Sequence, residues 1–190
     1  MKKLLFFFTL ILIYVGSVDA QTKVGVMLNT EVANDYLGVR PGAGLVIDHK
    51  VTRKGGIESG LFYRTYRNSI SVYVENPGIG RSIFFIEIGE SHMTIPILYK
   101  FHTRIVNLSF GPTFDFFLGW KQKSGSPDIE VNEYSIDPNF GYGAMLKMSK
   151  SIQLSDFVSF EPDLRFNPVF TNGRVFGGVG LAFKYQTKKN

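Results

Sequence analysis

Residues 106–120 alternate between apolar and polar or small side chains over almost their whole length, and this pattern restricts the possible folds more than any other feature. The first set consists of Val106, Leu108, Phe110, Pro112, Phe114, Phe116, Leu118 and Trp120, and the second of Asn107, Ser109, Gly111, Thr113, Asp115, Phe117 and Gly119. Successive side chains of a strand point to opposite faces, so the segment predicts a long strand with one apolar face and one mostly polar face. A membrane-spanning β-barrel requires this pattern, because its outer side chains contact lipid while its inner ones line a polar lumen.

Seven further segments show the same period, with varying regularity. The predicted strands are 23–30, 37–50, 56–67, 84–101, 106–120, 139–148, 157–170 and 174–186. The connections 51–55, 102–105 and 149–156 are short, whereas 68–83 and 121–138 are long and polar. Outer-membrane barrels have short periplasmic turns and longer outer loops. The sequence therefore predicts an all-β fold, an eight-stranded antiparallel up-and-down transmembrane β-barrel.

The alternatives are a water-soluble barrel and a β-sandwich, which also alternate but bury their apolar faces. In this chain the charged residues lie opposite the apolar stripe, where a barrel in lipid would place its lumen. A sandwich could still bury the apolar face between two sheets, and it remains the main alternative.

Residues 1–20 predict a secretory signal peptide, because Lys2 and Lys3 precede an apolar run over 4–15 and small or short residues flank Ala20. A membrane anchor is the alternative, although the run is shorter than the ~20 apolar residues that a spanning helix needs. The predicted organisation is a signal peptide over 1–20 and a barrel domain over 21–190, located in the outer membrane of a Gram-negative bacterium.

The composition excludes several classes of site and partner. The chain contains no cysteine, so the sequence predicts neither a disulfide nor a thiolate metal site. Its formal charge is +5, and the basic residues are scattered among acidic ones rather than clustered. Nucleic acid is therefore not an expected partner.

Two segments carry a family resemblance. Residues 94–101 read T-I-P-I-L-Y-K-F, a short turn follows, and 108–112 read L-S-F-G-P. Together with the closing segment 178–185, G-V-G-L-A-F-K-Y, they resemble the outer-membrane β-barrel domain family of Bacteroidetes, the PorT-like group. The resemblance implies an eight-stranded outer-membrane barrel with a possible link to cell-surface export, and it implies no reaction. Outer-membrane barrels usually end on an aromatic residue. This chain departs from that pattern, because the polar residues 186–190 follow its last aromatic residue, Tyr185.

The inward positions carry charges of both signs, which predicts a lumen closed by ion pairs. The predicted inward set is Arg40, Asp48, Glu58, Arg64, Asp115, Lys147, Glu161, Asp163, Arg165 and Lys184. A structural or binding scaffold is therefore the expected function, with a narrow pore for small solutes as the first alternative.

The second alternative is a lipid-modifying hydrolase at the outer rim, using His92 with Ser91 and the acids Glu87 and Glu90. Neighbouring residues of a strand point to opposite faces, so Ser91 and His92 are not expected to pair. The sequence accordingly predicts no enzyme, no catalytic, cofactor-binding or metal-binding residue, and no cofactor. The expected partners are outer-membrane lipid and lipopolysaccharide, with a protein or surface ligand at the predicted loops 68–83 and 121–138.

Overall fold

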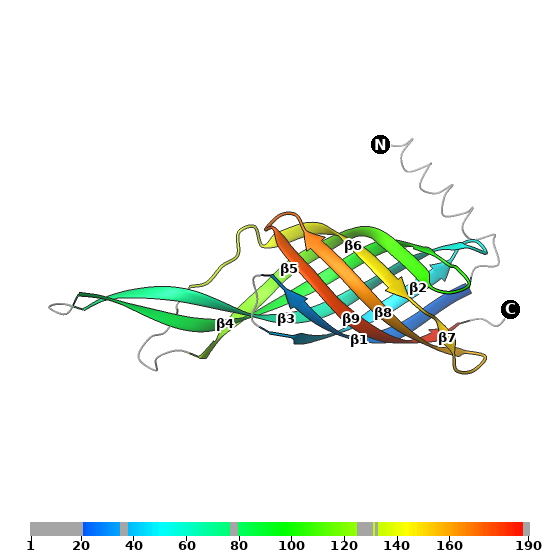
Figure 1. The fold of residues 1–190 in the computed structure, drawn as a ribbon, viewed down its shortest axis with the longest axis horizontal. Coiled ribbons are helices and arrows are strands. Elements are labelled where there is room, and N and C mark those ends of the chain that lie inside the picture. Colours follow the sequence, from blue (N-terminus) through cyan, green and yellow to red (C-terminus); the bar gives the residue numbers. More distant parts are fainter. Residues whose placement is uncertain (1–20, 35–37, 77–79, 125–130, 132, 188–190) are drawn as a thin grey trace, which may run out of the picture.

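The computed structural model describes residues 21–34, 38–76, 80–124, 131 and 133–187, and it forms one continuous sheet (Figure 1). The strands are β1 (Gln21–Ala33), β2 (Arg40–Lys50), β3 (Gly55–Asn76), β4 (Gly80–Phe101), β5 (Asn107–Ser124), β6 (Phe140–Ser149), β7 (Ile152–Gln153), β8 (Val158–Val169) and β9 (Arg174–Gln186). Long strands that are neighbours in sequence pair antiparallel, β1 pairs with β9, and β6 pairs with β8, which closes the ring. The short β7 lies in the turn between β6 and β8 and pairs only with β8. The predicted eight-stranded up-and-down barrel is therefore confirmed.

The two ends of the barrel differ (Figure 1). The first residue of β1, the last residue of β9 and the connections β2–β3, β4–β5 and β6–β8 lie at one end, called here the turn end. The paired strands β3 and β4 project from the opposite end, called here the hairpin end. Among the described residues, no helix has the length and apolar character needed to cross a bilayer.

The apolar side chains face outward, as the alternation predicts. Leu164 and Leu181 are 53% and 45% exposed, whereas Asp163 and Arg165, the two neighbours of Leu164 in its strand, are each only 5% exposed. A sandwich would reverse this arrangement, so the sandwich alternative is wrong. The exposed apolar belt includes Val26, Leu28, Leu45, Ile47, Leu61, Ile97, Phe110, Tyr142, Leu146, Phe166 and Phe183.

A bulge in β5 changes which residues face inward near the hairpin end. The register pairs His92 with Phe117 but Ser91 with Gly119, so Leu118 is the extra residue. Gly119 has φ +152°, a conformation that side-chain-bearing residues rarely adopt. Beyond the bulge Trp120 pairs with the inward Glu90 and packs on Tyr134 at 5.7 Å between ring centroids. The prediction that Trp120 faces outward is therefore wrong, because a strict period of two cannot register an inserted residue.

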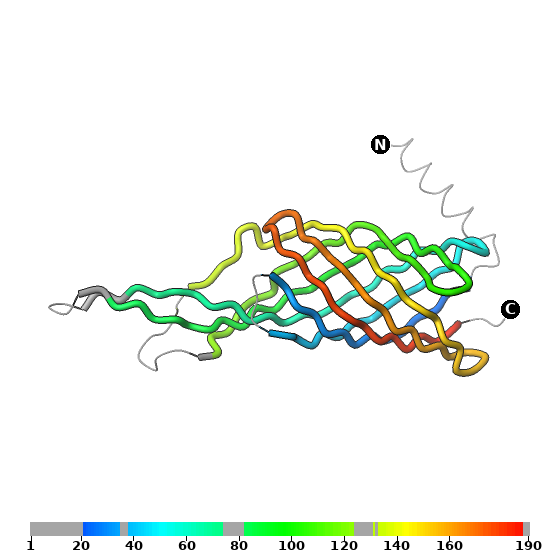
Figure 2. The backbone as a smooth tube through the Cα atoms, viewed as in Figure 1, coloured from blue at the N-terminus to red at the C-terminus, as the bar shows by residue number. Residues whose placement is uncertain are grey.

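The prediction of a loop over 68–83 is also wrong, because most of this segment belongs to strands β3 and β4. Strands β3 and β4 remain paired from Gly55↔Phe101 to Asn76↔Gly80, whereas the described pairing of β3 with β2 ends at Gly42↔Arg64. The two strands thus continue beyond the ring as a ribbon, supported by β5 as far as Glu87↔Ser124 (Figure 2). From residue 67 to residue 76 this ribbon extends about 30 Å at the usual rise per strand residue.

Other boundaries differ by a few residues. β2 begins at Arg40 rather than at 37, and the first residues of the predicted loop 121–138 continue β5 to Ser124. The predicted signal peptide 1–20, the middle of the predicted loop 121–138, and the last residues 188–190 lie outside the described residues.

Candidate functional site

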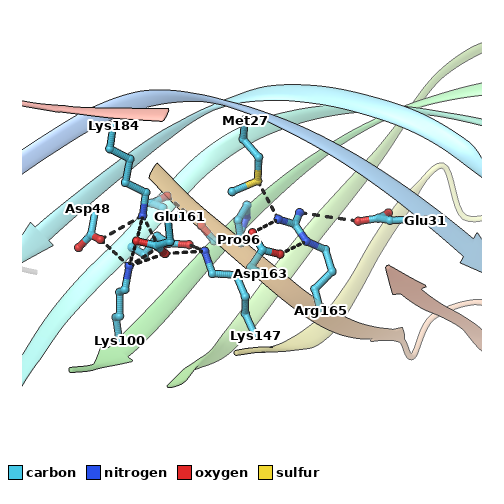
Figure 3. Close-up of polar contacts among 12 residues, drawn as sticks. Met27, Glu31, Asp48, Pro96, Lys100, Lys147, Glu161, Asp163, Arg165 and Lys184 are labelled. Carbon is cyan, nitrogen blue, oxygen red and sulfur yellow. Dashed lines mark hydrogen bonds and ion pairs between the residues drawn. The ribbon is translucent and has the colours of Figure 1, made fainter. Parts of the chain in front are cut away.

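The lumen is filled by side chains that alternate between apolar clusters and charged layers. Met27, Val46, Phe62 and Ala182 form one buried apolar cluster, and Tyr66, Val169 and Phe176 form another. Three polar layers accompany them, each built from residues that the alternation directs inward. Figure 3 shows the first of these layers and part of the second.

The first layer lies toward the turn end and is called here the lysine–carboxylate layer. It consists of Asp48, Glu58, Lys100, Lys147, Glu161 and Lys184, which come from six different strands. All six side chains are between 0% and 7% exposed.

Each lysine of this layer contacts at least two carboxylates. Lys100 donates to Asp48 at 2.6 Å and to Glu161 at 2.7 Å, and Lys184 donates to Asp48 at 3.1 Å and to Glu58 at 3.0 Å (Figure 3). Lys147 donates to Glu58 and lies 3.6 Å from Glu161. Three ammonium groups thus face three carboxylates, so the layer is electrically neutral. Buried charges are tolerated only when they are paired and hydrogen-bonded in this way.

The carboxylates of Asp48, Glu58 and Glu161 also have the spacing of a metal site, with one oxygen of each within 4.8 Å of the others. The ammonium groups of Lys100 and Lys184 lie among these oxygens and donate to them. The arrangement therefore uses lysines as the counter-charge of its carboxylates.

The second layer is built around two arginines. Arg165 donates to both carboxylate oxygens of Asp163, at 2.9 and 2.8 Å, and its Nη1 lies 3.7 Å from Glu31 (Figure 3). Arg64 lies 3.3 Å from the other oxygen of Glu31, donates to Asn167 at 3.1 Å and stacks over Phe176 at 5.6 Å. The bidentate contact fixes Arg165 and Asp163 relative to each other, and with Arg64 and Glu31 the layer is electrically neutral.

The third layer lies near the hairpin end and contains His92. Its Nδ1 is 3.0 Å from Asp115 and its Nε2 is 3.1 Å from Glu90. Thr94 donates to the other oxygen of Asp115, and Arg174 lies 3.5 Å from Glu90. Tyr134, from the β5–β6 connection, also donates to Glu90. Its partial burial, the larger cause, and this hydrogen bond together raise the pKa of Tyr134 to about 12.

The geometry does not bring together the residues of the hydrolase alternative. Ser91 lies on the outer face, where its hydroxyl is 3.0 Å from that of Tyr63, while His92 is 2% exposed inside the barrel. Both ring nitrogens of His92 contact carboxylates rather than a hydroxyl. The expectation that Ser91 and His92 point to opposite sides is confirmed.

The structure places the predicted inward charges as expected and adds others. Nine of the ten predicted residues are at most 6% exposed, and Arg40 lies half-buried at the hairpin end. Sequence reasoning did not include Lys100, Glu31 or Glu90, which complete the three layers. Lys100 could have been found, because the outward Tyr99 and Phe101 place it inward.

Two cavities open at opposite ends of the described barrel. One, of about 210 Å³, lies at the turn end and is lined by basic residues including Lys23, Lys50, Arg104 and Lys150. The other, of about 280 Å³, lies where β3, β4 and β5 leave the ring and is lined by Arg40, Arg67, Lys121 and Lys123 among others.

No family model matches the chain, and no curated protein matches it. Solved structures do resemble it. The outer membrane protein OprG from Pseudomonas aeruginosa aligns with a TM-score of 0.53 and 12% identity over 88% of this chain and 95% of its own. A major outer membrane protein from Thermus thermophilus aligns with a TM-score of 0.51 and 14% identity over 86% of this chain and 99% of its own. At these identities the likeness concerns the fold alone: this chain has the fold of the small outer-membrane β-barrel proteins.

Proposed function

We propose that the protein is an outer-membrane β-barrel that serves as a structural and binding scaffold, and neither an enzyme nor a solute pore. The observation that carries this proposal is the lysine–carboxylate layer, whose side chains are almost completely buried across the lumen. The fold of the protein and its exposed apolar belt support a location in lipid. In this proposal a cleaved signal peptide over 1–20 exports the chain, and the turn end faces the periplasm.

Outer-membrane lipid is the first proposed partner. The belt offers the acyl chains an apolar wall, and the cavity at the hairpin end carries Arg40, Arg67, Lys121 and Lys123 at its lining. Arginine and lysine bind phosphate oxygens through charge-assisted hydrogen bonds. We expect the phosphate groups of lipopolysaccharide to bind at this cavity, because basic side chains line it and it lies where the strands leave the ring.

The ribbon formed by β3 and β4 is the proposed docking surface for a protein partner. Tyr73, Ile83 and Phe85 lie on one face of it and are 58%, 55% and 73% exposed. Tyr73 is directly opposite Ile83, and Phe85 follows on the same face. Exposed apolar side chains gathered on a projecting element are typical of protein interaction sites. A role in cell-surface export is the more specific form of this proposal, and the resemblance of 94–101 and 108–112 to the PorT-like group supports it.

The ion-paired lumen predicts that the barrel does not conduct ions. We expect the refolded protein to give no discrete conductance steps in planar lipid bilayers, because the buried, ion-paired side chains of the lysine–carboxylate layer lie across the lumen. A known porin reconstituted at the same protein-to-lipid ratio serves as the positive control. Reproducible single-channel steps from folded protein would support the pore alternative instead.

The ribbon predicts a position-dependent contact in intact cells. A photo-crosslinking amino acid at Phe85 is expected to give a discrete protein adduct, because this side chain is 73% exposed on the proposed docking face. The same probe at Ile86, which is 0% exposed, and at Leu164 on the barrel wall should not give that adduct. Equal adducts from all three positions, or none from Phe85, would contradict the docking surface.

A further inference from the structure

We infer that the cavity at the turn end is a binding site for a phosphate group. This site needs only the barrel itself and is independent of the scaffold role at the hairpin end. It lies at the mouth that contains Gln21, the end of β2 and the β4–β5 turn. Its volume is about 210 Å³, enough for a phosphate group together with part of the alcohol to which it is esterified.

The cavity has an excess of positive charge. Lys23, Lys50, Arg104 and Lys150 line it, and within the described chain no carboxylate lies within ion-pair distance of any of these four. The lining includes two carboxylates, Asp48 and Glu161, together with Lys100.

Those two carboxylates do not balance the four cations. Asp48 already contacts Lys100 and Lys184, and Glu161 contacts Lys100, Lys147 and Lys184. They belong to the neutral lysine–carboxylate layer, which forms the floor of the cavity. The cations above this floor therefore lack counter-charges of their own, and an anionic ligand would supply them.

Arg104 lies on a turn that the hydroxyl of Thr103 closes with three hydrogen bonds. The hydroxyl of Thr103 accepts hydrogen bonds from the backbone amides of Ile105 at 3.3 Å and Val106 at 3.2 Å, and it donates to the carbonyl of Val106. These hydrogen bonds fix the backbone from which the Arg104 side chain projects. The planar guanidinium can bind two phosphate oxygens at once, and the lysine ammonium groups add positive charge without a geometric requirement. A phosphate group offers more acceptor oxygens to these four cations than a single carboxylate does.

The phosphate can come from a phospholipid headgroup of the adjoining leaflet or from a soluble phosphate ester. Ile105, which lines the cavity, is 74% exposed, and its apolar side chain at the rim is suited to contact an acyl chain. This position favours the lipid source, and titrations with each ligand separate the two.

The test uses the folded 21–190 barrel in a non-ionic detergent at constant ionic strength. Dihexanoylphosphatidylglycerol and inorganic phosphate are titrated separately, and ³¹P NMR follows each ligand. The variant R104Q/K150Q removes one arginine and one lysine from the cavity. The matched control R53Q/K54Q removes the same charges from the exposed β2–β3 turn at the same end, outside the cavity lining.

We expect saturable binding by the unmodified barrel, at least tenfold weaker binding by R104Q/K150Q, and a change of less than twofold for the control. Tighter binding of the lipid than of inorganic phosphate supports the headgroup, and equal affinities support a soluble phosphate. Absence of saturable binding, or equal weakening in the two variants, overturns the site. Heat-modifiable gel mobility verifies that each variant is folded.

Discussion

Substitution of Glu58 by glutamine is expected to destabilise the folded barrel by about 3–5 kcal/mol, the usual cost of removing one partner from a buried ion pair. Glu58 accepts hydrogen bonds from Lys100, Lys147 and Lys184, and it is 2% exposed. The variant leaves three buried ammonium groups facing two carboxylates. It also turns an amide NH₂ toward at least one of those ammonium groups.

The measurement is reversible urea unfolding in lipid vesicles, followed by the fluorescence of Trp120, the only tryptophan in the chain. The control is Glu87→Gln, which removes the ion pair between Glu87 and Arg67. The two charged groups are 3.4 Å apart, and both side chains are about a third or more exposed. Exposed pairs contribute at most about 1 kcal/mol, so the control should remain close to the unmodified protein. Similar losses for both variants would contradict a buried, mutually dependent charge layer.

The second large effect concerns the lipid-facing wall. Leu28 lies near the middle of β1, is 62% exposed and pairs with Leu181 across the β1–β9 interface. Substitution by arginine should cost about 2–4 kcal/mol in a bilayer, because a charged side chain at the membrane midplane is poorly solvated.

Leu154 provides the control for this substitution. It is 58% exposed, but it lies in the turn between β7 and β8 rather than in a strand of the ring. Leu154→Arg should therefore be nearly neutral in the same urea titration. A neutral Leu28→Arg would mean that the belt does not contact acyl chains, and the proposed membrane location would then fail.

The sequence predicted the side of the barrel on which most residues lie, because alternation is a local property of each strand. Leu164 and Arg165 illustrate this point: their opposite faces follow from adjacent positions alone, and the structure confirms both. The last strand, Arg174–Gln186, has the predicted bounds. The predicted existence of a polar, ion-paired lumen followed from the same reasoning.

Features that depend on non-local geometry could not be predicted in this way. The partners of Lys100 come from β2, β3 and β8, and their meeting depends on the stagger of strands around the ring. The ribbon escaped detection because strands outside a membrane need no lipid-facing apolar side, so Ser69 and Ser71 resembled a loop. The inward turn of Trp120 depends on a single inserted residue at Leu118.

The lysine–carboxylate layer also has a consequence for how the barrel enters the bilayer. Its six charges come from β2, β3, β4, β6, β8 and β9, and the contact of Lys147 with Glu161 joins β6 to β8, so the complete network forms only after these two strands have met. An open, partly inserted sheet would leave part of these ammonium and carboxylate groups uncompensated in hydrocarbon, at a cost of several kcal/mol for each. Insertion and ring closure should therefore occur together, and half-assembled intermediates should remain at the membrane surface.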